Sequence, residues 1–238
     1  MIADFSKDGA LGLLTLDSPP SNSLASPVFT DRKELAAFLA DPALKGVIVT
    51  GRGRHFCGGA DRVALESAME DPDRLAADLA KGKELLDIIS FALVPVVAAI
   101  RGQCLGGGLE IALACHFRIA AGSALFGFPE ATMGLLPGLG GTQANPGRMR
   151  RQALIDLVLS GRMVGADEAL EMGLVDRVVA KSKVEDAARE RIDELTGRRP
   201  AAVVRAIMES IHNARRMDRD AALKRETILF RELVKRKS

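Results

Sequence analysis

The stretch Cys104-Leu-Gly-Gly-Gly-Leu-Glu110 follows the apolar run Val94-Pro-Val-Val-Ala-Ala-Ile100. The apolar run predicts a buried strand, and the apolar residues from Leu109 to Ala114 predict a helix after the glycines. Backbone N–H groups in the first turn of a helix lack partners within the helix and carry partial positive charge. With Glu110 one turn into that helix, the stretch predicts a site that holds an oxyanion beside a carboxylate.

Strands and helices alternate along most of the chain. The predicted strands are 10–17, 45–50, 95–100, 117–121 and 174–179, and the predicted helices are 26–40, 71–91, 109–114, 151–160 and 166–172. Ser182-Lys-Val-Glu185 has the pattern of a capping box, and the sequence beyond it is helical and mostly charged. We therefore expect an α/β core over residues 1–180 and a helical C-terminal segment over 181–238 that packs on a partner.

Composition excludes several classes of protein. The 238 residues are 47% hydrophobic and carry a net charge of +2, which gives no reason to expect nucleic-acid binding. No apolar run approaches the roughly 20 residues that cross a bilayer, and the first residues lack a signal-peptide pattern. The three cysteines have no zinc-type spacing, so we expect free thiols, no metal and a cytoplasmic location.

Basic residues accumulate at the end of the chain. From Arg198 onward, twelve Lys and Arg residues stand against five Asp and Glu residues. This excess is typical of a solvated helical face. The alternative is a patch for an anionic ligand such as a phosphorylated cofactor.

Two further segments complete the glycine turn. In Phe56-Cys-Gly-Gly-Ala-Asp61, small side chains let a ligand approach the backbone, and the Ala60 N–H is a candidate donor. Phe126-Gly-Phe-Pro-Glu130, followed by the glycine-rich run from Gly134 to Gln143, adds a second glutamate. Two backbone donors and two carboxylates are the parts for enolate chemistry, in which donors hold a charged oxygen and carboxylates move protons at the adjacent carbon. Phosphate loops do not fit, since G-x-G-x-x-G spacing and a Walker Lys-Ser/Thr ending are both missing.

Together with Ser23-Leu24, these segments resemble the successive signature blocks of the crotonase (enoyl-CoA hydratase/isomerase) superfamily, in family order over roughly residues 5–180. The resemblance implies a crotonase-like spiral core of ββα repeats. It also implies assembly as a homotrimer or a dimer of trimers. The implied substrate is an acyl-CoA thioester, with coenzyme A as part of the substrate and no cofactor bound permanently.

The resemblance also assigns roles to residues. The backbone N–H groups of Ala60 and Gly107 would form an oxyanion hole, and Glu110 and Glu130 match the two glutamates of the hydratases. Further implied substrate-binding positions lie around these groups, namely Ser23, Leu24, Gly58, Asp61, Arg62, Val63, Gly106, Pro129 and Leu136.

The implied reaction is the reversible addition of water across C2=C3 of a 2-enoyl-CoA. Glu110 is assigned to activating the water and Glu130 to proton exchange at C2. The alternatives are an isomerase or dehydratase acting on a specialised or carrier-protein-bound acyl thioester, and a catalytically silent subunit that keeps the fold for assembly. The presence of both glutamates favours hydration.

Each of these residues also has a purely structural interpretation. Glu110 could serve the helix dipole, Pro129-Glu130 could be an ordinary turn, and the glycines could serve tight packing. Their joint occurrence in one family's order favours the chemical interpretation. The cysteines are expected to be inert small hydrophobes, His55 and His212 to lie on the surface, and His116 to have no role.

The chain departs from the family pattern at two places. Ala144-Asn145-Pro146 stands where many hydratases have Arg-Leu-Pro, which affects the local helix start. The chain also ends at Ser238, short of the family's longer helical tail. Lys235, Arg236 and Lys237 are candidates to reach CoA phosphates, on the same or an adjacent subunit, and a shorter tail would also suit an acyl carrier protein.

Overall fold

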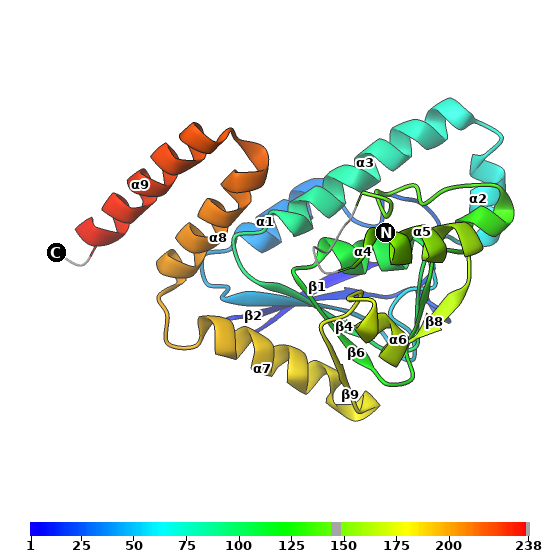
Figure 1. The fold of residues 1–238 in the computed structure, drawn as a ribbon, viewed down its shortest axis with the longest axis horizontal. Helices are drawn as coiled ribbons and strands as arrows, with labels where there is room; N and C mark the ends of the chain where they lie inside the picture. The colour runs from blue at the N-terminus through cyan, green and yellow to red at the C-terminus, as the bar shows by residue number, and fades with distance from the viewer. Residues whose placement is uncertain (144–148, 237–238) are drawn as a thin grey trace.

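Two β-sheets form the centre of the fold in this computed structural model, which describes residues 1–143 and 149–236 (Figure 1). The strand order of the large sheet is β1 (Ala3–Asp8), β2 (Leu11–Leu16), β3 (Gly46–Gly51), β4 (Val96–Ile100), β6 (Phe117–Ala121) and β9 (Arg177–Val179). Only β1 runs antiparallel to its neighbour; the other pairs are parallel. The small sheet has the order β5 (Gln103–Leu105), β7 (Leu125–Gly127) and β8 (Met163–Gly165).

Helices cover both faces of the large sheet. Alternate residues of each strand point to opposite faces, so Val47 and Val49 pack in one hydrophobic cluster and Ile48 in another. The first cluster includes residues of α1 (Arg32–Ala40), α3 (Pro72–Ser90) and α4 (Gly107–Ala114). The second includes residues of α7 (Val184–Thr196), which lies on the other side of the sheet in Figure 1. A parallel sheet covered in this way needs strands that are apolar on both faces.

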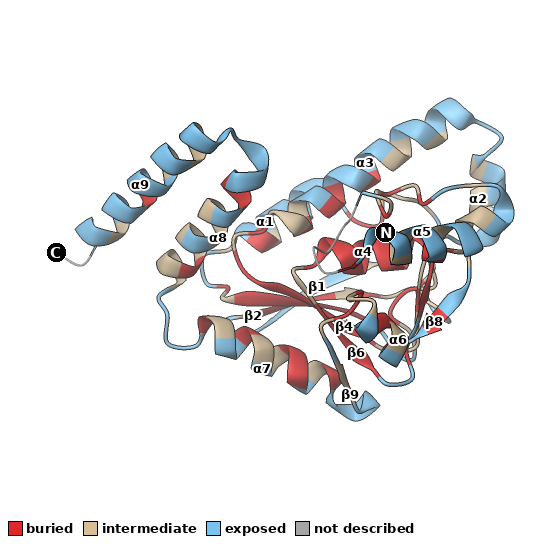
Figure 2. Ribbon diagram, viewed as in Figure 1, coloured by how far each residue is buried: buried red, intermediate tan, exposed pale blue. Residues whose placement is uncertain are grey.

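The central strands have that character, and they confirm the predicted α/β class. Every residue of β3 and β4 is buried, as the red strands in Figure 2 show. The predictions for 10–17, 45–50, 95–100 and 117–121 correspond to β2, β3, β4 and β6. The predicted strand at 174–179 is confined to its last three residues, in β9.

The first helix begins later than the predicted residue 26. Ser26 Oγ accepts a hydrogen bond from the Val28 N–H at 3.1 Å and forms a local turn. The helix cap is Asp31, whose carboxylate accepts hydrogen bonds from the N–H groups of Lys33 and Glu34. The predicted cap at Asp71 is confirmed, because its carboxylate accepts a hydrogen bond from the Arg74 N–H at 3.0 Å.

Residues 122–147, for which no strand or helix is predicted above, contain β7 and the 3-10 helix η1 (Pro129–Met133). Ala144, Asn145 and Pro146 lie outside the described residues. The predicted capping box is wrong, since Ser182 lies inside the 3-10 helix η2 (Lys181–Lys183) and α7 begins at Val184 without a side-chain cap. The predicted helices at 151–160 and 166–172 correspond to α5 (Arg151–Ser160) and α6 (Ala166–Glu171).

The helices α8 (Ala201–Arg216) and α9 (Arg219–Lys235) form a hairpin that extends away from the sheets in Figure 1. His212 anchors α8, because its Nε2 lies 3.0 Å from the Ala92 carbonyl oxygen and its ring stacks on His116 at a centroid distance of 5.4 Å. His212 is buried, so the prediction of a surface position is wrong. The boundary at residue 180 stays a prediction, although α7 packs on the sheet of the core.

Candidate active site

Two backbone segments that carry predicted site residues run side by side. Cys57 and Cys104 form a parallel bridge, in which the Cys57 N–H donates to the Gln103 oxygen and the Leu105 N–H donates to the Cys57 oxygen, each at 3.0 Å. Ala60 and Gly107 each follow the bridge by three residues. Just before them, Gly59 and Gly106 lie side by side, since a Cβ on Gly59 would lie 3.6 Å from the Gly106 Cα.

The Ala60 N–H points away from the neighbouring segment that contains Leu24. Leu24 bridges Ala60 by donating to the Gly59 oxygen and accepting from the Asp61 N–H, both at 2.8 Å. In a parallel bridge of this kind, the N–H of the central residue faces the opposite direction. Gly107 is the first residue of α4, where helix N–H groups have no partner within the helix.

Glycines allow these segments to approach each other closely. A Cβ on Gly108 would lie 2.4 Å from the Cys57 oxygen, and a Cβ on Gly59 would lie 2.7 Å from the Leu105 oxygen. Gly59 also has φ +89°, which L side chains rarely adopt. The glycine clusters therefore allow tight packing, and this packing brings the segments that carry the Ala60 and Gly107 amides next to each other.

Glu110 is buried within the first turn of α4. Its Oε1 accepts hydrogen bonds from the backbone N–H groups of Leu139 and Gly141, each at 2.7 Å. Burial raises the pKa of Glu110 to about 7, and the charge of Glu130 acts in the same direction, while the two amide hydrogen bonds oppose both. The side chain is thus held in one orientation and titrates near neutrality.

Glu130 lies in η1, directly after Pro129. Its Oε1 is 2.7 Å from the position that a Cβ on Gly106 would occupy, so its carboxyl group lies against the glycine turn. Among the described residues, its buried Oε2 has no hydrogen-bond partner. Burial also raises the pKa of Glu130. Two carboxyl groups with raised pKa values on one glycine turn are typical of an acid–base site.

The predicted substrate-binding residues before α2 form a connected group. The Gly58 N–H donates to the Ser21 oxygen at 2.8 Å, and Ser23 Oγ lies 2.8 Å from Ser21 Oγ. Leu24 is buried, and its Cδ1 lies 3.0 Å from the Cβ position of Gly107. The fold therefore brings Ser23, Leu24 and Gly58 alongside the segment that carries Ala60.

The remaining predicted binding residues are more exposed. Asp61 caps α2 (Arg62–Ala68) by accepting a hydrogen bond from the Ala64 N–H at 2.9 Å. Arg62 pairs with Glu66 on the helix surface, and the Val63 side chain is 76% exposed. Leu136 is 68% exposed. These positions are open to a ligand that extends outward from Ala60.

Leu139 and Gly141, whose amides hold Glu110, are not among the predicted site residues. Both belong to the glycine-rich segment Gly134–Gln143. A Cβ on Gly141 would lie 2.8 Å from the Phe128 ring, so this turn packs tightly against the residue that precedes η1. The signal that could have found them is the glycine spacing, which leaves backbone amides unobstructed.

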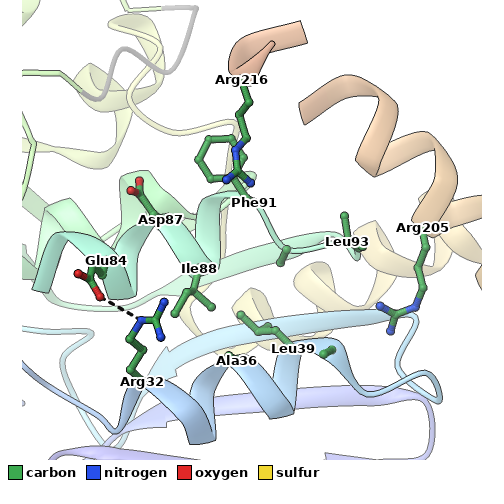
Figure 3. Close-up of a pocket in the computed structure, with 12 residues that line it drawn as sticks. Arg32, Ala36, Leu39, Glu84, Asp87, Ile88, Phe91, Leu93, Arg205 and Arg216 are labelled. Atoms are coloured by element: carbon green, nitrogen blue, oxygen red, sulfur yellow. Dashed lines mark ion pairs between the residues drawn. The ribbon is translucent and has the colours of Figure 1, made fainter. Parts of the chain in front are cut away.

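A separate groove of about 510 Å³ lies between α1, α3 and α8 (Figure 3). Its lining includes the apolar side chains of Leu39 and Ile88, with Arg205 and Arg216 at its margins. The Arg216 guanidinium lies 4.6 Å from the centroid of the Phe91 ring. The predicted site residues are not among the described residues that line this groove.

Within the described residues, no group of three or more His, Cys, Asp or Glu side chains could hold a metal ion. In the same residues, no helix is long and apolar enough to cross a bilayer. All three cysteines are free and buried, and burial raises the pKa of Cys57 and Cys115 to about 12. Such thiols carry little thiolate at neutral pH.

The arrangement defines the class of protein: an α/β enzyme fold with two carboxyl groups beside backbone amides. Residues 6–238 match the family model described as enoyl-CoA hydratase/isomerase. The chain therefore belongs to the enoyl-CoA hydratase/isomerase (crotonase) family. A Geobacillus kaustophilus enoyl-CoA hydratase structure has a TM-score of 0.86 and 31% identity, covering 98% of this chain and 88% of that one, which confirms the predicted crotonase fold.

The relatives differ in how much of their own length matches this chain. A Bacillus subtilis (strain 168) protein named probable enoyl-CoA hydratase is 34% identical over 94% of this chain and 87% of its own length. The carnitinyl-CoA dehydratase of Proteus mirabilis is 35% identical over 87% of this chain and 78% of its own. The peroxisomal bifunctional enzyme of Danio rerio is 41% identical over 75% of this chain, but the match spans only 24% of that enzyme.

Proposed function

We propose that this protein is a hydro-lyase that adds water reversibly across C2=C3 of a 2-enoyl-CoA thioester. The observation that carries the proposal is the pairing of Glu110 and Glu130, two carboxyl groups with raised pKa values, on one glycine turn. Family membership supports a CoA thioester as substrate without a permanently bound cofactor. The buried free cysteines suit a reducing cytoplasm.

In this proposal, the thioester oxygen accepts hydrogen bonds from the amides of Ala60 and Gly107. Negative charge develops on that oxygen when water attacks C3, because the electron pair of C2=C3 moves toward the carbonyl. One preorganised donor is worth on the order of 3 kcal/mol at this stage. CoA would extend from the thioester along the Ser23–Leu24 segment and past Asp61, Arg62 and Val63, while Gly58, Gly106, Pro129 and Leu136 contact the substrate.

The two glutamates would have different tasks. Glu110 accepts two amide hydrogen bonds, which favour its ionised form, so it is assigned to deprotonating the water that attacks C3. Glu130 has a buried oxygen without a partner among the described residues, a setting that favours the protonated form. It is assigned to delivering the proton to C2.

Crotonyl-CoA provides the direct test. Addition of water removes the conjugated enoyl-thioester absorbance, and the wild-type protein should produce 3-hydroxybutyryl-CoA at the same rate. Glu110→Gln and Glu130→Gln should each lower turnover by about 100-fold or more. Two variants that both keep wild-type turnover would overturn the assignment of the glutamates.

A dehydratase acting on a specialised acyl thioester is the second candidate, favoured by the 35% identity to carnitinyl-CoA dehydratase. It uses the same site, and assays with 3-hydroxyacyl thioesters of CoA and of an acyl carrier protein distinguish the substrates. Normal CoA binding without turnover of any enoyl thioester would instead favour a silent subunit.

We also propose that the α8–α9 hairpin mediates assembly into a homotrimer or a dimer of trimers. Ile207, Ile211, Ile228 and Phe230 are each 44% or more exposed on this hairpin. Such a surface is commonly covered by a partner. Sedimentation equilibrium of the wild type and of Phe230→Asp tests this: the variant should dissociate at concentrations at which the wild type stays assembled.

A further inference from the structure

Leu139 holds Glu110 through its backbone and packs against helix α3 through its side chain. Its amide donates to Glu110 Oε1 at 2.7 Å, and its side chain is 7% exposed. The Leu139 Cδ1 lies 3.6 Å from the Cβ position of Gly107. One residue therefore hydrogen-bonds the proposed base and has its side chain beside the glycine that carries the proposed oxyanion donor.

The space behind the Leu139 side chain is closed. Its Cδ2 lies 2.6 Å from the Cβ position of Gly82 in α3, and the Pro27 oxygen lies 2.9 Å from that same position. A second α3 side chain, Leu79, reaches within 2.8 Å of the Cβ position of Gly138. Leu139 thus cannot move toward α3 without a shift of the helix, and interiors packed this tightly resist such shifts.

We propose that the Leu139 side chain limits the acyl group to short, unbranched chains. The proposal rests on the hydratase function proposed above. With the thioester oxygen at the Gly107 amide and C2–C3 between the glutamates, a carbon chain that continues from C3 meets Leu139. A longer or branched acyl chain must displace the Leu139 side chain, and the Leu139 amide moves with that side chain. The hydrogen bond that orients Glu110 is then weakened, so turnover falls as well as affinity.

Leu139→Ala tests this because it removes three side-chain carbons and keeps the amide. We expect the ratio of kcat/KM for trans-2-octenoyl-CoA to that for crotonyl-CoA to rise about 10-fold or more over wild type. The gain should appear in kcat for the longer substrate. Leu139→Val, which removes one carbon, should change the ratio in the same direction by less and guards against a failure of Leu139→Ala to fold.

Leu39→Ala is the matched control, since Leu39 is a leucine of α1 that is also buried and lies in the other groove. It should leave the substrate ratio unchanged. If Leu139→Ala and Leu39→Ala give the same ratio, or if chain length alters KM alone in the wild type, the inference is wrong. If the wild type turns over no enoyl thioester at all, the proposed function fails instead.

Discussion

Glu130 Oε1 lies 2.7 Å from the point where Gly106 would carry a Cβ atom. The glycine is also held at φ +48° and ψ −124°, a conformation that other residues adopt only with strain. The turn that begins α4 therefore places one proposed donor, at Gly107, and makes room for one proposed acid. Substitution at Gly106 should affect both.

Gly106→Ala should lower turnover of crotonyl-CoA by about 100-fold, because the methyl group displaces the carboxyl group that serves as general acid. Backbone strain should destabilise the fold by roughly 1–3 kcal/mol as well. Gly53→Ala is the matched control, since Gly53 has φ +75° with nothing within 4 Å of its Cβ position. The control should lose stability without losing turnover. Equal turnover in both variants would contradict the role given to Gly106.

The main components of the site could be predicted from sequence because they are local. A buried strand, a glycine turn and a glutamate one helical turn later are consecutive in the chain, and α4 begins among those glycines. The contact between Leu139 and Gly82 could not be predicted in this way, because it depends on how α3 packs across the site. No short-range pattern reports such a contact.

Short and competing local signals explain the errors in the fold. β7 and β8 have three residues each, too few for a period-2 pattern to stand out. Ser26-Pro27 and Asp31 are both plausible helix starts, and only the structure distinguishes the turn from the cap. The burial of His212 cannot be predicted from a local pattern, because the ring on which it stacks, that of His116, is distant in the sequence.

The activity should depend on the ionisation of Glu110. A base whose pKa is raised to about 7 is protonated below that pH, so kcat/KM for crotonyl-CoA should fall tenfold per pH unit on the acidic side. The pKa obtained from this acidic limb of the pH–rate profile belongs to the interacting pair of glutamates, since the charge of Glu130 contributes to the shift. Rates measured from pH 5 to pH 9 check this. An acidic limb near pH 4.5, the ordinary value for a glutamate, would be evidence against a buried base.

Glu110 should also make stability depend on pH. Its pKa in the folded protein, about 7, exceeds the value of 4.5 in the unfolded chain. The folded state therefore binds the proton more tightly, and stability falls as pH rises from 4.5 to 7, by about 3 kcal/mol in total. Glu110→Gln lacks this loss, so it should be more stable than wild type at pH 8.5, with the difference shrinking toward pH 5. Urea unfolding at both pH values measures it, and a difference independent of pH would contradict the shifted pKa.

His116, at the junction with the C-terminal hairpin, should make stability fall as pH decreases, which is opposite to the effect of Glu110. Its Nδ1 accepts a hydrogen bond from the Val96 N–H at 2.9 Å, and its Nε2 lies 3.1 Å from the Ser90 oxygen, so the ring is neutral with the proton on Nε2. Burial lowers the pKa of His116 to about 4, and the nearby His212 and Arg118 add to the shift.

Because the unfolded chain binds this proton at pH 6.5 and the folded chain only near pH 4, stability is lost as pH falls through that window. Between pH 7 and pH 5, His116 should cost the wild type about 2 kcal/mol of unfolding free energy. His116→Asn does not titrate there and can still accept from Val96, so the difference in unfolding free energy between the two proteins should change by that amount. Parallel stability curves for the two proteins from pH 7 to pH 5 would mean that His116 is protonated in the folded state.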